Sequence, residues 1–374
     1  MKIAAVGDIM PGGVLHGRKG LFVSDKVLAI LRDADIRVGT LETAVGNEPS
    51  FYEEKMVRKA DVIYVKDDDL KRLTELDINV VSLANNHFFD LGPEGAIHAI
   101  ELLDSMGIKH CGAGRNLEEA SKPVVFEKGG KSIAFLAFCD WRDETVGWCP
   151  FATETDPGVN PMYDDYVEEE IAKYKKRYDY VAVIPHWGKE HTFVTTKEVY
   201  VLANKMIQAG ADMVFGGHTH RIQPVVKKKK SVVAYSMGNF FFPDRLIIKP
   251  RSTYYTDSPL DLNSLPVTKG FPFVERVTLK LWHPLARIGE IVTVCVERDV
   301  DIVATNHVKL SARNNTLEIS SLSLWIQIIM GWQKMWLAFL PYSHYAVLFA
   351  KVKSWAKKIM RISFYDLYRK ASRR

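Results

Sequence analysis

Short runs of apolar residues alternate with longer amphipathic stretches over the first two-thirds of the chain. The runs at 3–6, 35–40, 78–83, 180–184 and 213–215 are rich in β-branched residues and lead into a glycine or a polar side chain. Because their apolar residues do not alternate regularly with polar ones, these runs are typical of strands covered on both faces. The pattern therefore predicts buried strands, each of which delivers polar residues at its end.

The stretches between these strands have helical periodicity at 93–106, 163–178 and 197–209. Pro93 stands at the start of the first stretch, Gly107 follows its end, and Gly210 stops the third. Two strand pairs, 122–127 with 131–138 and 225–226 with 231–237, are predicted hairpins, and further strands are predicted at 273–282 and 290–296. Strands that alternate with helices and hairpins predict a layered α/β sandwich.

The chain is expected to divide into a domain at 1–300 and a helical tail at 315–374. Within the domain, the stretches near 141–162 and 243–272 are rich in Pro, Gly, Asp and Ser and are predicted to be loop insertions. The segment 321–340 is nearly all apolar or aromatic but carries Gln327, Gln333 and Lys334. This composition favours an amphipathic helix at a membrane interface over a spanning helix. A helix that packs back onto the first domain is an equal alternative.

Charge is distributed unevenly along the chain. The net charge is +5, but residues 351–374 contain nine Lys or Arg against Asp366 alone, which leaves −3 for the first 350 residues. A basic tail on a slightly acidic body indicates contact with an anionic surface. We therefore expect peripheral membrane contact through 321–374 and no nucleic-acid partner, because no basic stripe accompanies the polar strand ends.

Cysteine usage and the N-terminal pattern bear on localisation. The four cysteines lack Cys-x-x-Cys spacing and are too few for a disulfide scaffold, which favours buried thiols in a reducing compartment. The apolar run at 3–6 is too short for a signal-peptide core and is predicted to be a first strand. The expected localisation is cytoplasmic, with a peripheral location on the inner face of the membrane as an extension of this hypothesis.

Chemically active side chains gather at the predicted strand ends. They are Asp8, Glu42, Asn86-His87, His186 and the pair His218-x-His220 after Gly216-Gly217. Carboxylates, an amide and imidazoles on neighbouring loops make a mixed nitrogen and oxygen site that suits Mn, Fe or Zn. In open α/β sheets ligands bind outside the strand ends, so this edge is the expected active site.

Other polar residues near the motifs have alternative roles. Glu42 is also of the type that caps a helix, and Asn85 can satisfy backbone groups in its own loop, which makes Asn86 the preferred ligand. Glu190 and His191 are equally compatible with a place behind the ligands and with the surface. Asn239 is expected to order the loop beneath the metals.

The motifs together resemble the CapA-type family, linked to capsule and poly-γ-glutamate synthesis, within the calcineurin-like metallophosphatase superfamily. The resemblance covers about residues 2–242 and is carried by Gly7-Asp8-Ile9-Met10-Pro11-Gly12, Leu41-Glu42-Thr43, Ser82-Leu83-Ala84-Asn85-Asn86-His87 with Asp90 and Gly92, Gly112-Ala113-Gly114, His186-Trp187-Gly188-Lys189-Glu190, Gly210-Ala211-Asp212, Gly217-His218-Thr219-His220 and Ser236-Met237-Gly238-Asn239-Phe240. It implies a four-layer α-β-β-α sandwich with a two-metal site at its mouth.

The resemblance also implies roles for individual residues. Asp8 and His220 would bind the first metal, Asn86, His186 and His218 the second, and Glu42 would bridge the two. His87, held by Asp90, would be the general acid that protonates the leaving alkoxide.

One departure bears on the first metal. The wider superfamily has Asp-x-His in its first motif, whereas this chain has Met10 at the third position, a poor ligand for a hard cation. The first site is then weak, is completed by water, His191 or Glu190, or is absent in a one-metal enzyme.

Two classes of function follow. The first is a metal-dependent phosphoesterase acting on a phosphorylated or anionic polymer-related substrate. The second is a non-hydrolytic component of polymer synthesis that binds polymer or partners at a membrane. A nucleic-acid phosphodiesterase, with the tail as phosphate binder, ranks below both.

Overall fold

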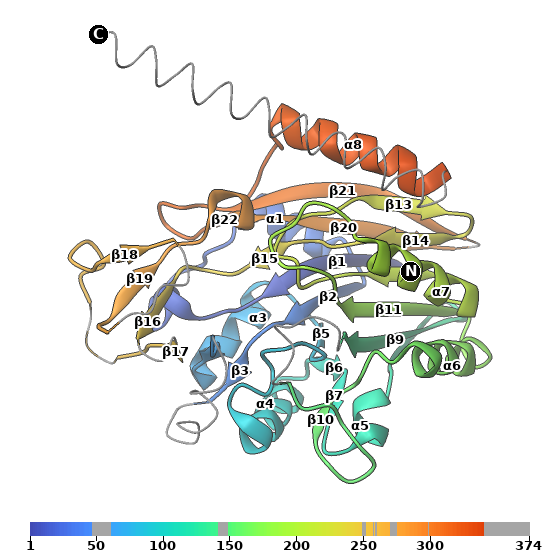
Figure 1. Ribbon diagram of the computed structural model, residues 1–374, viewed down its shortest axis with the longest axis horizontal. Coiled ribbons are helices and arrows are strands. Elements are labelled where there is room, and N and C mark those ends of the chain that lie inside the picture. The colour runs from blue at the N-terminus through green and yellow to red at the C-terminus, as the bar shows by residue number, and fades with distance from the viewer. Residues whose placement is uncertain are drawn as a thin grey trace.

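The computed structural model describes residues 1–46, 61–140, 149–248, 252–256, 258, 260–269, 275–297 and 299–339 (Figure 1). The predicted basic tail beyond 339 and residues 141–148 of the predicted first insertion lie outside the described residues. Two large sheets and the helices around them make a mixed α/β protein.

The first sheet has eight strands in the order β22-β21-β20-β1-β2-β5-β6, with β15 beside β1. Its strands are β1 (Lys2–Ile9), β2 (Ile36–Leu41), β5 (Val80–Ser82), β6 (Lys109–Cys111), β15 (Asn239–Phe241), β20 (Ile288–Val296), β21 (Val300–Leu310) and β22 (Leu317–Ile319). Strands β1, β2, β5, β6 and β15 are parallel, so the ends of β1, β2 and β5 that carry the polar motifs meet at one edge.

The second sheet has six strands in the order β13-β14-β12-β11-β9-β8. They are β8 (Val124–Lys128), β9 (Lys131–Cys139), β11 (Tyr180–His186), β12 (Met213–Phe215), β13 (Val225–Lys228) and β14 (Ser231–Ala234). The predicted hairpins are the β8–β9 and β13–β14 pairs, and the four inner strands are parallel.

Side chains of the second sheet alternate between two hydrophobic cores. Phe135 belongs to the cluster that also contains the strands of the first sheet, whereas Leu136 belongs to a second cluster with α6 (Asp164–Lys175) and α7 (Lys197–Ala209). Successive residues of a strand point to opposite faces, so the second sheet has the first sheet on one side and two helices on the other. This double coverage explains the consecutive apolar residues in its strands.

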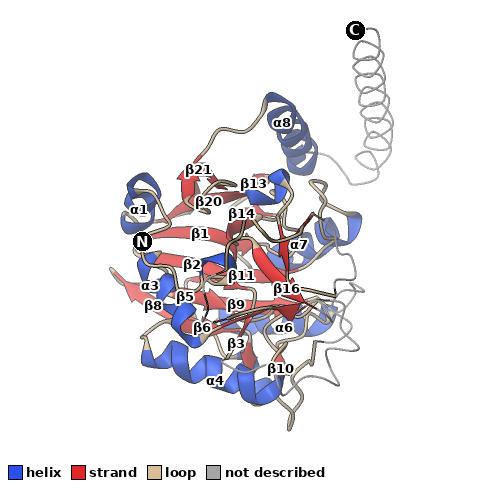
Figure 2. Ribbon diagram, turned by 90° about the vertical axis from the view of Figure 1, so that its left-hand side faces the viewer, coloured by secondary structure: helices blue, strands red, loops and turns tan. Residues whose placement is uncertain are grey.

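The remaining elements cover the first sheet and its loops. Helices α1 (Asp25–Arg32), α3 (Lys71–Glu75) and α4 (Gly92–Ser105) share the core of the first sheet, α5 (Leu117–Ser121) contacts β7 (Ala113–Gly114), and short 3₁₀ turns occur at Gly13–Leu15, Asp67–Leu70 and Pro284–Arg287. Strands β3 (Ala44–Val45) and β4 (Tyr64–Val65) pair with each other. In both ribbon views α4 and α8 lie on opposite sides of the strands (Figures 1 and 2).

The two predicted insertions contain short strands rather than loops alone. The second forms part of a four-stranded sheet of β16 (Arg245–Ile248), β17 (Ser252–Thr253), β18 (Val267–Thr268) and β19 (Thr278–Lys280). In the first, β10 (Gly158–Val159) pairs with β7. Strands of two to four residues leave no periodic signal, so the sequence pattern shows these segments only as loops.

The C-terminal part of the described chain packs on the sheets. Strands β21 and β22, which the pattern did not predict, extend the first sheet beyond β20. Helix α8 (Leu324–Phe339) packs Ile326 and Met330 against Ile222, and the buried Gln333 side chain bonds the backbone of Phe193 and Thr195. The alternative of a helix packed back on the body is therefore confirmed for α8. Within the described residues, no helix combines the length and apolar character needed to cross a membrane.

Candidate metal centre

The polar strand ends of the two sheets meet at one edge of the molecule. Asp8 is the penultimate residue of β1 and Glu42 follows β2, while His186 ends β11 in the second sheet. A bridge between His186 and Gly217 joins β11 to the turn after β12. Since the strands concerned are parallel within each sheet, tertiary packing brings their carboxyl ends together as the sequence predicts.

The turn after β12 requires two glycines because the backbone passes close to other groups. A Cβ at Gly216 would collide with the carbonyl oxygen of Tyr235, and one at Gly217 would lie within 3.0 Å of Asp8 Oδ1. His218 (φ 84°) and His220 (φ 50°) both have left-handed backbone conformations, which residues with a side chain rarely adopt. Such strain clusters at functional sites, where surrounding structure holds it in place.

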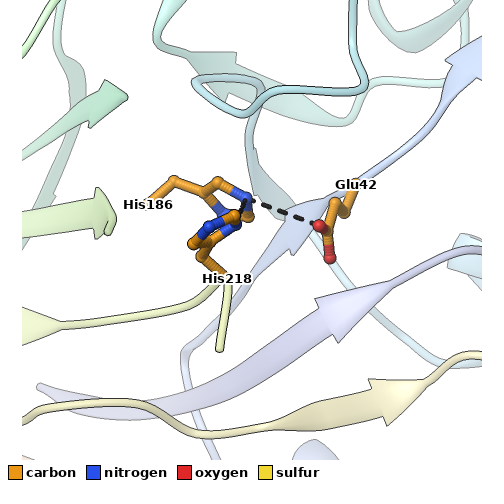
Figure 3. Close-up of side chains that lie close together, drawn as sticks. All are labelled: Glu42, His186 and His218. Carbon is orange, nitrogen blue, oxygen red and sulfur yellow. Dashed lines mark hydrogen bonds and ion pairs between the residues drawn. The ribbon is translucent and has the colours of Figure 1, made fainter. Parts of the chain in front are cut away.

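Among the residues that the structure describes, two groups of buried side chains have ligand atoms close enough to hold a metal ion, and both contain Glu42. One group is Glu42, His186 and His218, and the other is Asp8, Glu42 and His220; in each, the ligand atoms lie within 4.8 Å of one another. Glu42 Oε1 is 3.4 Å from His186 Nε2, and Glu42 Oε2 is 3.7 Å from His220 Nδ1. Figure 3 draws the contact between Glu42 and His186 as a dashed line. One carboxylate therefore faces both groups with different oxygens.

Asn86 belongs beside the first of these groups. Its Oδ1 is 2.9 Å from His186 Nε2, and that nitrogen is 3.1 Å from His218 Nδ1. Four possible ligand atoms therefore converge: the Asn86 amide oxygen, one imidazole nitrogen each from His186 and His218, and the carboxylate oxygen Glu42 Oε1. This is the mixed donor set that borderline divalent cations accept.

Burial changes the pKa values of the candidate ligands and so favours their uncharged forms. It raises the pKa of Asp8 to about 7, although the backbone N–H and the ring of His218 oppose the shift. Burial, followed by the neighbouring imidazoles, lowers the pKa of His186 and of His220 well below the usual histidine value. A bound cation would favour the ionised carboxylate and the neutral imidazoles, which are the ligand forms of these groups.

Buried polar atoms that lack a hydrogen-bond partner indicate whether the site suits a metal ion. Asp8 Oδ1 and His186 Nδ1 are buried and have no hydrogen-bond partner within the described part of the chain. A buried polar atom without a partner costs about 1–3 kcal/mol, which coordination would offset at Asp8. The buried, oxygen- and nitrogen-rich set fits a divalent cation.

Asn239 orients His220. Its Oδ1 is 2.8 Å from His220 Nδ1, while its Nδ2 donates to the carbonyl oxygen of Ala286 at 2.9 Å. Because the amide nitrogen is committed to that carbonyl, Oδ1 must accept from a protonated Nδ1. With Nδ1 protonated, His220 would hold a cation through the Nε2 lone pair, whereas Nδ1, the nitrogen 3.7 Å from Glu42 Oε2, would act as a hydrogen-bond donor.

His87 and Asp90 form a buried pair beside the metal centre. His87 Nδ1 is 2.7 Å from Asp90 Oδ2, which also accepts the backbone N–H of Ile63 at 2.7 Å. Asn85 accepts from the N–H of His87 at 3.0 Å and donates to the carbonyl of Leu41 at 2.8 Å. Asn85 thus satisfies backbone groups, as its alternative interpretation has it, and ties the His87 loop to the end of β2.

Three residues discussed for the weaker metal lie outside both ligand groups. Met10 is fully buried in the hydrophobic core. Glu190 Oε2 lies 3.7 Å from His191 Nε2, and the His191 ring is centred 5.7 Å from that of His220. Both side chains are partly exposed, so they form a rim beside the centre.

Trp282 is part of the site and was missed by the sequence analysis. Its ring is centred 5.3 Å from His220 and 5.0 Å from Phe242. Trp282 follows β19, and the small sheet carries it to the centre, so no local signal marks it. Trp187, the tryptophan of the His186-Trp187-Gly188 motif, is fully buried and donates to the carbonyl of Tyr235.

Comparison with known proteins identifies the class. Residues 2–244 match the family model described as bacterial capsule synthesis protein PGA_cap, so the chain belongs to this family and the predicted CapA-type relationship is confirmed. The chain is 30% identical over 244 residues to the PGA biosynthesis protein CapA of Bacillus subtilis, covering 63% of this chain and 62% of that protein. It is 31% identical over 253 residues to the capsule biosynthesis protein CapA of Bacillus anthracis, covering 65% and 60%.

The match thus spans less than two-thirds of either relative. Among solved structures, the NAD nucleotidase of Haemophilus influenzae superposes with a TM-score of 0.40 at 10% identity, covering 96% of this chain and 60% of that one. The grouping of the candidate ligands comes from the geometry of this chain alone, and their role as ligands stays a prediction.

Proposed function

We propose that this protein is a metal-dependent phosphoesterase with a four-layer metallophosphatase-like sandwich that acts in capsule or poly-γ-glutamate synthesis. The observation that carries the proposal is the shared carboxylate: Glu42 belongs to both buried ligand groups. A carboxylate that bridges two cations is the arrangement of two-metal hydrolytic sites. The names of the two CapA relatives supply the biological context.

Each side chain has a defined task in this proposal. Asp8 and His220 would hold one cation, Asn86, His186 and His218 the other, with Glu42 between them. Bound cations would supply a lowered water pKa and a clamp for phosphoryl oxygens. Asn239 and Asn85 keep His220 and the His87 loop in position.

His87 is the proposed proton donor. Its Nδ1 faces Asp90, so the proton to be transferred sits on Nε2 of the imidazolium form. A leaving alkoxide takes that proton as the phosphoester bond breaks, and Asp90 stabilises the charge on the ring before transfer.

Metal content and phosphoester hydrolysis test the proposal together. Purified protein is expected to contain Mn, Fe or Zn and to hydrolyse p-nitrophenyl phosphate or its bis ester, and His218→Ala is expected to lose metal and activity. The matched control is His110→Ala. It also removes an imidazole, but His110 pairs with exposed Asp104 and belongs to neither ligand group. Metal-free protein whose hydrolysis is unaffected by His218→Ala would refute the proposal.

A second candidate, a non-hydrolytic polymer-synthesis component at the inner membrane face, is favoured by the outer face of α8. Leu324 and Ile328 are 72% and 61% exposed there, and Trp325 and Met335 are also exposed. Apolar side chains next to a stretch with nine basic residues suit an anionic lipid surface.

Vesicle flotation tests this candidate with the full-length chain. Leu324→Gln together with Ile328→Gln should reduce flotation with anionic vesicles, whereas Val303→Gln, an exposed apolar residue on β21, should not. Equal flotation of all three proteins would remove α8 from the membrane contact.

A further inference from the structure

A buried cluster of charged residues lies on the small four-stranded sheet. Arg245 and Lys280 are direct cross-strand partners of β16 and β19, and their side chains are only 1% and 5% exposed. Arg245 Nη2 donates to Asp61 Oδ2 at 2.8 Å, and Lys280 Nζ lies 3.6 Å from the same oxygen. Two cations therefore share one carboxylate oxygen.

The guanidinium group of Arg245 makes fewer hydrogen bonds within the described part of the chain than its N–H groups allow. Its Nε and Nη1 are buried and have no hydrogen-bond partner within the described part of the chain. Buried ion pairs that serve structure alone are normally saturated with hydrogen bonds, because an unpartnered charged donor in the interior is costly.

Arg287 in the same chain provides the comparison. It donates to both carboxylate oxygens of Asp244 and approaches Asn315 Oδ1, and none of its nitrogens is buried without a partner. Arg245 differs in keeping two buried nitrogens, Nε and Nη1, whose N–H groups can each donate a charge-assisted hydrogen bond to an oxygen of a carboxylate or phosphate.

Trp282 connects the cluster to the metal centre. Arg245 Cζ and Lys280 Nζ lie 5.8 Å and 5.9 Å from the centre of the Trp282 ring, and the same ring is 5.3 Å from that of His220. One indole therefore contacts both the cations and a candidate metal ligand.

The segment at Asp61 makes a second connection. Ile63, two residues after Asp61, donates its backbone N–H to Asp90, the partner of His87. Burial would raise the pKa of Asp61, but Arg245, Lys280 and then His87 lower it to about 2, so His87 lies within electrostatic range. The cluster thus lies on the side of the centre where His87 and His220 are found.

We propose that Arg245 and Lys280 form an anion-binding subsite that receives a carboxylate or phosphate group of the substrate next to the reacting phosphoester. The inference rests on the proposed function for the identity of that substrate, but the binding site itself depends on the cation pair alone. The Asp61 carboxylate already contacts both cations, so it competes with the incoming anion.

Calorimetric binding of inorganic phosphate and of glutarate, at constant ionic strength, tests the subsite. Both are measured on the full chain and on Glu42→Gln, which alters both ligand groups, so that phosphate held by metals is separated from phosphate held by the subsite. Arg245→Gln and Lys280→Gln should each weaken binding in both backgrounds about tenfold, as expected for the loss of one charge-assisted hydrogen bond. Asp61→Asn should strengthen it.

The control is Lys230→Gln, because Lys230 is 87% exposed and lies 3.8 Å from Asp299. Preference for phosphate or for glutarate would identify the anionic group. Unchanged binding in both Arg245→Gln and Lys280→Gln would overturn the subsite, and so would Asp61→Asn weakening binding as much as Arg245→Gln. Metal content, measured in parallel, reports failure of the proposed function separately.

Discussion

Gly217 lies against Asp8 so closely that a Cβ at position 217 would fall within 3.0 Å of Asp8 Oδ1. The next residue, His218, donates its backbone N–H to Asp8 Oδ2 at 3.1 Å. The turn that carries two candidate ligands is thereby built directly on a third. This contact explains the second glycine of the Gly-Gly-His-Thr-His motif by close approach, since the positive φ values of the turn are at His218 and His220.

Gly217→Ala is expected to displace Asp8 and to weaken metal binding at the Asp8–His220 group. Overpacking of this kind typically costs about 1–3 kcal/mol. Metal content and the free energy of unfolding would be measured beside Gly331→Ala, where a Cβ meets nothing within 4 Å. Undiminished metal content in Gly217→Ala would contradict the close approach as a determinant of the site.

Glu42→Gln is expected to weaken both metals, because one carboxylate faces both ligand groups. Asp8→Asn and His218→Ala should each affect one metal more than the other. Titration of metal-stripped protein with Mn²⁺ or Zn²⁺, followed by mass spectrometry of bound metal and by melting temperature, distinguishes these patterns. The shared role of Glu42 is wrong if its substitution removes no more metal than either single-site variant.

Asp90→Asn should lower phosphoester hydrolysis about 10- to 100-fold without lowering metal content, since Asp90 acts through His87. The asparagine can still accept the Ile63 N–H, which preserves the loop. Asp104→Asn, which alters an exposed His–Asp pair, is the matched control. If Asp90→Asn lost metal in proportion to activity, the residue would belong to the metal site.

Lys280 should make stability depend on pH. Burial, and then Arg245, lower its pKa to about 7, against about 10.4 in an unfolded chain. Between these values the unfolded chain binds a proton that the folded one does not, so this group makes the free energy of unfolding rise with pH. Its slope is at most about 1.4 kcal/mol per pH unit. Below pH 7 both states are protonated and the slope disappears.

Denaturant unfolding of Lys280→Met between pH 7 and pH 10 measures this contribution. The variant should show a smaller increase with pH than the parent, and Lys230→Met, at an exposed position, should follow the parent. An identical slope in all three proteins would show that Lys280 keeps an ordinary pKa.

The elements predicted from local pattern are those whose signal is local. Helix α7 has the predicted bounds because Thr196 caps its start, accepting the N–H of Val199, and Gly210 ends it with φ 116°. The parallel strands were readable because both faces are covered. Strands β16 to β18 were not, because each has only two to four residues and leaves no periodic signal, whereas β19 lies within the strand predicted at 273–282.

The sequence by itself determined which chemically active side chains stand at strand ends, and it identified the CapA-type family. Those facts are local, because the residues that follow a strand in the sequence also lie at its end in the fold. Only the tertiary structure decided that Glu42 faces both His186 and His220, that Asn239 orients His220, and that Trp282 and the Arg245–Lys280 pair lie beside them. These relations depend on how two sheets and a small third sheet pack, and packing brings together residues that have no neighbouring positions in the chain.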